Sequence, residues 1–147
     1  MKKILPPTLL SACIGLMILL QFTLPIYRII KSPFNLSGIV LIIIGFGISV
    51  IGSNKFRQLR TSVITFDEPS VLVTNGLYKY SRNPMYLGFV ILILGIWILM
   101  GSLSTLFVAI LFIVVTDLYY IRFEEEMLNK KFGKAYHEYQ KKVRRWI

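Results

Sequence analysis

Two apolar runs decide the fold: MYLGFVILILGIWILM, from Met85 to Met100, and LSTLFVAILFIVVTDLY, from Leu103 to Tyr119. Runs of this length are typical of transmembrane helices, because about 20 helical residues cross the hydrocarbon core of a bilayer. Only Gly101 and Ser102 separate the two runs. We therefore expect a tight antiparallel hairpin of two membrane helices.

Two further apolar runs precede them, from about Ile4 to Ile26 and from about Leu36 to Gly52. The chain has 147 residues, of which 55% are hydrophobic and 16% charged, and its mean hydropathy is +0.66. This composition predicts a single all-α domain spanning residues 1–147, without a separate soluble domain. We expect a polytopic integral membrane protein with about four transmembrane helices.

The basic residues predict an orientation. If the N-terminus is cytoplasmic, only Arg28 and Lys31 of the 17 Lys and Arg residues fall on the far side. The positive-inside rule then favours both termini inside, a cytoplasmic loop at 53–84 and a cytoplasmic tail at 120–147, most simply in the cell (inner) membrane. Topology and attraction to anionic headgroups also explain the net charge of +10. Nucleic-acid binding is disfavoured, because the charge lies along the membrane borders.

The N-terminus allows a second interpretation. Lys2 and Lys3 before an apolar run resemble a signal peptide, and Leu10 to Cys13 resembles a lipoprotein cleavage site. The apolar run continues to Ile26, which favours an uncleaved span. Cys13 is the only cysteine, so we expect no disulfide or thiolate metal site within the chain, and a packed apolar role for this side chain.

Small residues mark the second span. Its Gly45-Phe46-Gly47 sequence lacks the strand and new helix that a dinucleotide loop requires. We expect Gly45, Gly47, Ser49 and Gly52 to allow close approach of neighbouring helices.

The loop before the third span is polar, basic and aromatic. From Gly76 to Gly88 it reads GLYKYSRNPMYLG. Upstream, Asp67 to Ser70 predicts a turn, and Val71 to Val73 a short β-prone run. A second polar group, Glu124 to Glu126, follows the fourth span. On a helix, Arg122 would face Glu125 and Glu126, where ion pairing is available.

Asp117 and the tail leave alternatives open. Asp117 is either a polar site residue or a hydrated residue at the interface. The tail carries an amphipathic stripe that either lies on the membrane or covers the loop, and Gly133 is expected to interrupt its helix. The only histidine, His137, is expected to be a surface residue. The stripe consists of Leu128, Phe132, Tyr136, Tyr139 and Val143.

The chemistry-bearing residues form no serine– or cysteine–histidine pair and no set with metal-ligand spacing. They form two motifs, Gly76-x-Tyr78-x-x-x-Arg82-Asn83-Pro84-x-Tyr86-x-Gly88 and Glu124-Glu125-x-x-Leu128-x-x-x-Phe132-Gly133-x-x-Tyr136-x-x-Tyr139. In this order they resemble the isoprenylcysteine carboxyl methyltransferase family, which belongs with the membrane phospholipid methyltransferases. The resemblance covers roughly the C-terminal half of the chain.

The resemblance implies an integral membrane methyltransferase that uses S-adenosyl-L-methionine and takes a lipophilic small molecule or lipid as substrate. It places substrate contacts at Tyr120 and Arg122. It assigns no catalytic side chain. The implied cofactor-binding residues are Ser70, Val71, Leu72, Val73, Tyr78, Asn83, Pro84, Met85, Tyr86 and Glu124.

The chain departs from the family at three positions. Asn83 and Ser70 stand where the family usually or often has histidine, and Tyr120 stands where it often has a substrate-binding arginine. Asparagine can donate and accept hydrogen bonds but cannot act as a base near neutral pH. The sequence therefore favours an acceptor that is already ionised, such as a carboxylate, over an amine that must first lose a proton.

Two other functions stay open at this stage. One is an NADPH-dependent membrane reductase of sterol-reductase-like plan, whose extra phosphate the basic loop could hold. The other is a non-enzymatic lipid-binding protein. Four small spans would also be compatible with a dimer.

Overall fold

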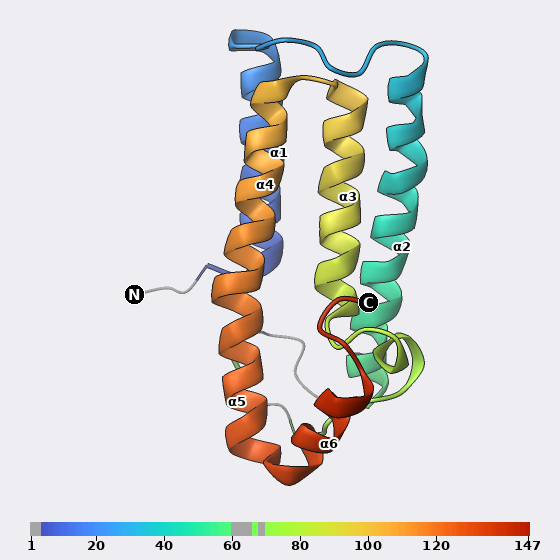
Figure 1. Cartoon of the computed structure of the whole chain (residues 1–147), viewed down its shortest axis with the longest axis vertical. Helices are drawn as coiled ribbons and strands as arrows, with labels where there is room; N and C mark the ends of the chain where they lie inside the picture. Colours follow the sequence, from blue (N-terminus) through green and yellow to red (C-terminus); the bar gives the residue numbers. More distant parts are fainter. Residues whose placement is uncertain (1–3, 60–65, 68–69) are drawn as a thin grey trace.

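A computed structural model describes residues 4–59, 66–67 and 70–147. In this part of the chain the regular secondary structure is helical (Figure 1). Lys2, Lys3 and Arg60, as well as Glu68 and Pro69 of the predicted turn, lie outside the described residues. The elements in chain order are α1 (Pro6–Thr23), η1 (Phe34–Leu36), α2 (Ser37–Gln58), η2 (Gly76–Lys79), α3 (Pro84–Met100), α4 (Leu103–Val115), η3 (Thr116–Ile121), α5 (Arg122–Phe132) and α6 (Lys134–Lys142).

The long helices form a bundle of two pairs. Helix α2 packs along α3, helix α1 packs along α4, and α3 joins the pairs (Figure 1). Three helical stretches are long and apolar enough to cross a membrane, and α3 is a shorter apolar helix. The four predicted apolar segments thus all form helices. The three long stretches are Pro6–Thr23, Phe34–Gln58 and Leu103–Phe132.

The outer faces of the bundle are apolar. Phe22 of α1 is 84% exposed, and Phe46 of α2 is 62% exposed. Such faces are suited to lipid, because backbone polar groups are already satisfied within each helix. Cys13 is buried in the core between helices, which confirms its predicted packing role.

The α3–α4 hairpin forms as predicted. Helix α3 ends at Met100 and is capped by Gly101, whose φ of +72° is a left-handed conformation that favours glycine. Its carbonyl accepts a hydrogen bond from the Ile29 backbone N–H at 2.7 Å. The Thr105 hydroxyl then donates to the Ser102 carbonyl at 2.9 Å and closes the first turn of α4. The Gly101 conformation and the Thr105 contact reverse the chain within two residues, and Ile29 adds a contact from outside the hairpin.

Helices α2 and α3 approach each other at backbone distance. A Cβ added to Gly45 would lie 2.5 Å from the Gly88 carbonyl oxygen. One turn further on, the Ser49 hydroxyl donates to the Met85 carbonyl at 3.1 Å. Such small residues permit the close packing that holds membrane helices together. Gly52 faces Met85 in the same interface, so the predicted role of these three α2 residues is confirmed.

The same prediction was wrong for Gly47. A Cβ at this position would meet nothing within 4 Å. Gly47 is two residues from Gly45 and therefore lies on a different side of α2.

Helices α4, η3 and α5 form one continuous rod from Leu103 to Phe132 (Figure 1). Its middle segment, η3, is a π-helical turn, which adds a residue to the turn and rotates the following side chains. The rod ends at Gly133, with φ +47°, so the predicted helix interruption is confirmed. Helix α6 then folds back and returns the C-terminus to the start of α3.

The tail stripe covers the loop. Tyr136, Tyr139 and Val143 are buried in one cluster, and Leu72 of the loop packs against it. This confirms the second of the two alternatives for the tail. Residues 71–73 form no strand, contrary to prediction, because this segment packs side chains against the tail instead of pairing its backbone with another strand.

The contact between α2 and α3 predicts a contrast between two glycines. Gly45→Ala should destabilise the protein by about 1–3 kcal/mol, because the new methyl group collides with backbone atoms of α3. Gly47→Ala should be neutral or stabilise it by about 0.5–1 kcal/mol, because alanine favours the helix. Thermal unfolding in detergent measures both changes. Equal effects of the two substitutions would contradict the packing described here.

Candidate active site

A hydrogen bond joins the two sequence motifs. Tyr86 lies in the first turn of α3, and Glu124 lies in the first turn of α5. The Tyr86 hydroxyl donates to Oε1 of Glu124 at 2.6 Å, a distance typical of a bond to a charged acceptor. The structure thus brings together two predicted cofactor-binding residues from separate elements.

Aromatic rings surround this pair. The rings of Tyr120 and Tyr86 stack, with centroids 6.4 Å apart and planes 22° apart. The Tyr120 hydroxyl donates to the Ile4 carbonyl at 2.9 Å. Tyr120 and Glu124 lie four residues apart across the junction of η3 and α5, and both contact Tyr86. Partly buried side chains of Phe66, Phe89 and Trp146 pack around them.

Tyr78 lies next to this group and is buried. Its ring meets Phe56 of α2 edge-on, with centroids 5.4 Å apart, and its carbonyl accepts from the Tyr139 hydroxyl at 2.6 Å. Burial raises the pKa of Tyr78, and the negative charge of Glu124 raises it further. Tyr78 is therefore a neutral phenol at physiological pH.

Residues 70–73, predicted to bind the cofactor, lie against the C-terminal tail. Ser70 and Val71 are exposed, whereas Val73 is 6% exposed and Leu72 contacts the tail cluster. Helix α6 therefore positions this segment. The side chains become more buried along the segment, from exposed Ser70 and Val71 to buried Val73.

Three predicted residues at the start of α3 have structural partners. The Asn83 side-chain amide donates to the Arg145 carbonyl at 3.1 Å. Pro84 is buried at the first helical position, where its missing N–H costs nothing. Met85 contacts Gly52 of α2. Asn83 is thus a positioning group for the C-terminus in this structure.

An ion network lies beside the Tyr86–Glu124 pair. Glu125 accepts from Arg82 at 3.1 Å and from Arg145 at 2.6 Å. Arg145 also reaches Asp117 at 3.2 Å, and the Trp146 indole N–H donates to Asp117 at 3.0 Å. Asp117 is therefore an ion-paired residue that anchors the C-terminus.

The expected partner of Glu125 was wrong. Glu125 pairs with Arg82 and Arg145, whereas Arg122 is exposed on α5. Of the two predicted substrate residues, Arg122 is exposed, whereas Tyr120 is only 2% exposed. Sequence reasoning missed Arg145. The sequence feature that pointed to it was the run of acids Glu124 to Glu126 in a basic tail, because such acids require cationic partners.

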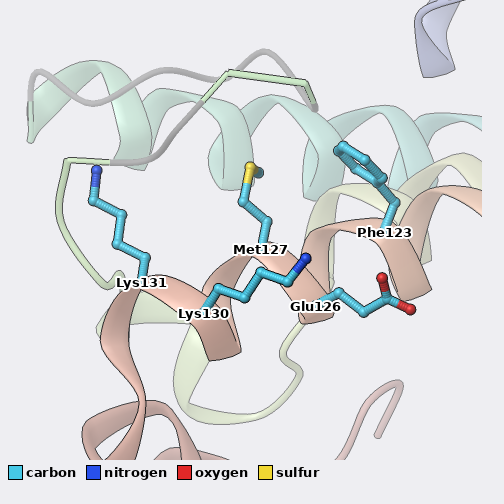
Figure 2. Close-up of a pocket in the computed structure, with 5 residues that line it drawn as sticks. All are labelled: Phe123, Glu126, Met127, Lys130 and Lys131. Carbon is cyan, nitrogen blue, oxygen red and sulfur yellow. The ribbon is translucent and has the colours of Figure 1, made fainter.

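A depression of about 330 Å³ lies on the neighbouring face of α5. Figure 2 shows Phe123, Met127 and Lys131 projecting from the helix on one side. The depression therefore combines apolar surface with positive charge. Its lining residues are Phe123, Glu126, Met127, Lys130 and Lys131.

His137 is exposed on α6, with Nδ1 3.2 Å from Oε1 of Gln140. It is a surface histidine, as predicted, and lies outside the aromatic group around Tyr86.

These features define an integral membrane protein with a carboxylate–tyrosine site at one end of a helical bundle. A family model described as phospholipid methyltransferase matches residues 34–135. Because this match covers more than half of the chain, the chain belongs to the phospholipid methyltransferase family.

Several curated relatives carry one name. Protein-S-isoprenylcysteine O-methyltransferase of Schizosaccharomyces pombe is 43% identical over 77 residues, which are 50% of this chain and 31% of the relative. Protein-S-isoprenylcysteine O-methyltransferase A of Arabidopsis thaliana is 33% identical over 113 residues, which are 72% of this chain and 55% of the relative. The Saccharomyces cerevisiae enzyme of the same name is 32% identical over 121 residues, 80% of this chain and 50% of the relative.

The chain thus spans about half or less of the length of these relatives. No solved structure matches the chain.

Buried tyrosines around the loop predict a response to alkaline pH. Burial raises the pKa values of Tyr78, Tyr136 and Tyr139. Their contribution to stability is complete below the unfolded pKa of about 10 and is lost as pH rises through the folded values. The free energy of unfolding should therefore fall above pH ~10.

Denaturant unfolding in detergent at increasing pH measures this fall. Tyr139→Phe should make it less steep, because one of the titrating phenols is removed. Tyr80→Phe, at a side chain that is 75% exposed, should leave the slope unchanged. A Tyr139→Phe slope equal to that of the wild type would contradict the assignment.

Proposed function

We propose that this protein transfers a methyl group from S-adenosyl-L-methionine to a small lipophilic acceptor at the membrane–cytoplasm interface. The observation that carries the proposal is the 2.6 Å hydrogen bond between Tyr86 and Glu124. It unites the two motifs into one site in a chain of the phospholipid methyltransferase family. The names of the curated relatives support an isoprenylcysteine-type carboxylate or a lipid as the acceptor.

The residues present fit this cofactor by their chemistry. The Glu124 carboxylate can accept hydrogen bonds from ribose hydroxyls, and its charge favours a cationic group nearby. The buried rings of Tyr86 and Tyr120 lie beside this carboxylate, and aromatic rings attract cations. The remaining proposed cofactor contacts are the backbone of segment 70–73 together with Tyr78, Asn83, Pro84 and Met85.

The bound cofactor supplies a methyl group that is already activated by its sulfonium. A carboxylate acceptor is already ionised near neutral pH, so the chain needs to align the reactants and exclude water. Asn83 is consistent with a mechanism that needs no base, because its amide donates to the Arg145 carbonyl and cannot accept a proton near neutral pH. Arg122, exposed at the start of α5, would supply a cation for the acceptor carboxylate. Tyr120, buried beside Tyr86, would form the inner aromatic wall of the acceptor site.

The distribution of basic residues supports four spans with both termini in the cytoplasm. In this orientation the Tyr86–Glu124 site lies at the cytoplasmic leaflet, where a lipophilic acceptor could enter sideways from the bilayer. The cell (inner) membrane would suit this arrangement.

Ligand titration in detergent tests the cofactor assignment. We expect saturable binding of S-adenosylhomocysteine and no comparable binding of NADPH. Tyr86→Phe and Glu124→Gln should weaken binding at least about tenfold, because each removes a hydrogen bond to a charged group.

Two matched controls share the same chemistry. Tyr80→Phe and Glu138→Gln alter exposed side chains that are not among the proposed cofactor contacts, and should bind like the wild type. Folded protein that binds NADPH but not S-adenosylhomocysteine would favour a reductase, and folded protein that binds neither would favour a non-enzymatic role.

A further inference from the structure

The C-terminal segment Arg144–Trp146 lies against the loop that precedes α3. The Arg82 backbone N–H donates to the Arg144 carbonyl at 3.0 Å. The Ser81 hydroxyl and the Asn83 amide both donate to the Arg145 carbonyl, at 3.3 and 3.1 Å. Three consecutive loop residues therefore bind the last residues of the chain. We call this arrangement the C-terminal clasp.

The side chain of Arg145 extends the clasp to the rod. Its Nη2 lies 2.6 Å from Oε2 of Glu125, and its Nε donates to Oε1 at 3.3 Å. This two-point contact fixes the orientation of the carboxylate as well as its distance. The Nη1 atom of Arg145 meets Asp117 at 3.2 Å. One guanidinium thus binds the rod at two positions, one in η3 and one in α5.

The network is balanced in charge. Arg82 and Arg145 face the two carboxylates of Glu125 and Asp117. The side chains of Glu125 and Arg82 are each only 12% exposed, so loss of one cation leaves a nearly buried carboxylate with less compensation. The hydrogen bonds to Glu125 stabilise the protonated form of Arg145 and raise the pKa of its guanidinium.

These contacts bracket the candidate active site. Asp117 precedes Tyr120 by three residues, and Glu125 directly follows Glu124. Any rotation of the rod that displaces Glu125 displaces Glu124 with it, since both lie on one rigid helix. The contacts of Arg145 therefore restrain the part of the rod that faces Tyr86.

We propose that Arg145 is a positioning residue of the methyl-transfer site, holding η3 and α5 in the register that presents Glu124 to Tyr86. This inference rests on the proposed function. Arg145 acts through Glu125 and Asp117. Its effect on the cofactor is indirect.

The chain offers a matched control in Arg144. Arg144 is exposed, and its carbonyl contact with Arg82 survives a change of side chain. Arg145→Gln and Arg144→Gln remove the same charge from adjacent residues. Arg145→Lys keeps the charge but cannot reproduce the planar two-point contact.

The experiment measures S-adenosylhomocysteine affinity and the thermal midpoint for the wild type and these three variants. Arg145→Gln should weaken binding at least about tenfold, and Arg144→Gln less than about twofold. Arg145→Lys should melt near the wild-type temperature and still bind several-fold more weakly. If Arg145 only stabilised the fold, Arg145→Lys would regain the wild-type affinity together with the wild-type melting temperature.

Each other outcome has one meaning. Wild-type affinity in folded Arg145→Gln or Arg145→Lys overturns the positioning role. Equal losses in Arg144→Gln and Arg145→Gln overturn it too, because they indicate a general charge effect. If Arg145→Gln does not fold, the affinity of folded Arg145→Lys alone tests the positioning role. If the wild type itself shows no saturable binding, the proposed function fails and this inference fails with it.

Discussion

The Glu125 carboxylate is the point on which the arrangement of this protein depends. Two arginines bind it, one from the loop before α3 and one from the end of the chain. Isolated burial of such a charge would be costly, so its environment requires both cations together. Meeting that requirement brings the loop, the rod and the C-terminus to one place, although the two arginines are separated by most of the C-terminal half of the chain.

The neighbouring glutamate benefits from this arrangement. Glu125 is committed to arginines, and Glu124 contacts the hydroxyl of Tyr86. Glu125 thus has a structural role, because its ion pairs hold the site together. Glu124 is the acid that is placed within the site. The π-helical turn contributes by placing Tyr120 and Glu124 toward the same partner. Helix α6 covers the loop from the opposite side, with Tyr139 held on the Tyr78 carbonyl.

The sequence predicted those features that local chemistry decides. Gly101 and Gly133 end helices because their backbones adopt positive φ. The apolar runs form helices, although α2 continues to Gln58, beyond its expected end at Gly52 and into the predicted loop. Gly45 and Gly47 were indistinguishable in sequence, because only the packing partner decides which face of α2 is covered. The clasp could not be foreseen. It joins residues more than 60 positions apart, and any of the tail cations could in principle have paired with Glu125.

Transfer of a labelled methyl group from S-adenosyl-L-methionine into a lipid extract tests the central claim most directly. The account predicts a labelled lipophilic product with wild-type protein and with Glu138→Gln. With Glu124→Gln the labelling rate should fall at least about tenfold, because the carboxylate that accepts from Tyr86 is lost. Absence of any labelled product with folded wild-type protein, or equal labelling by Glu124→Gln, would contradict it.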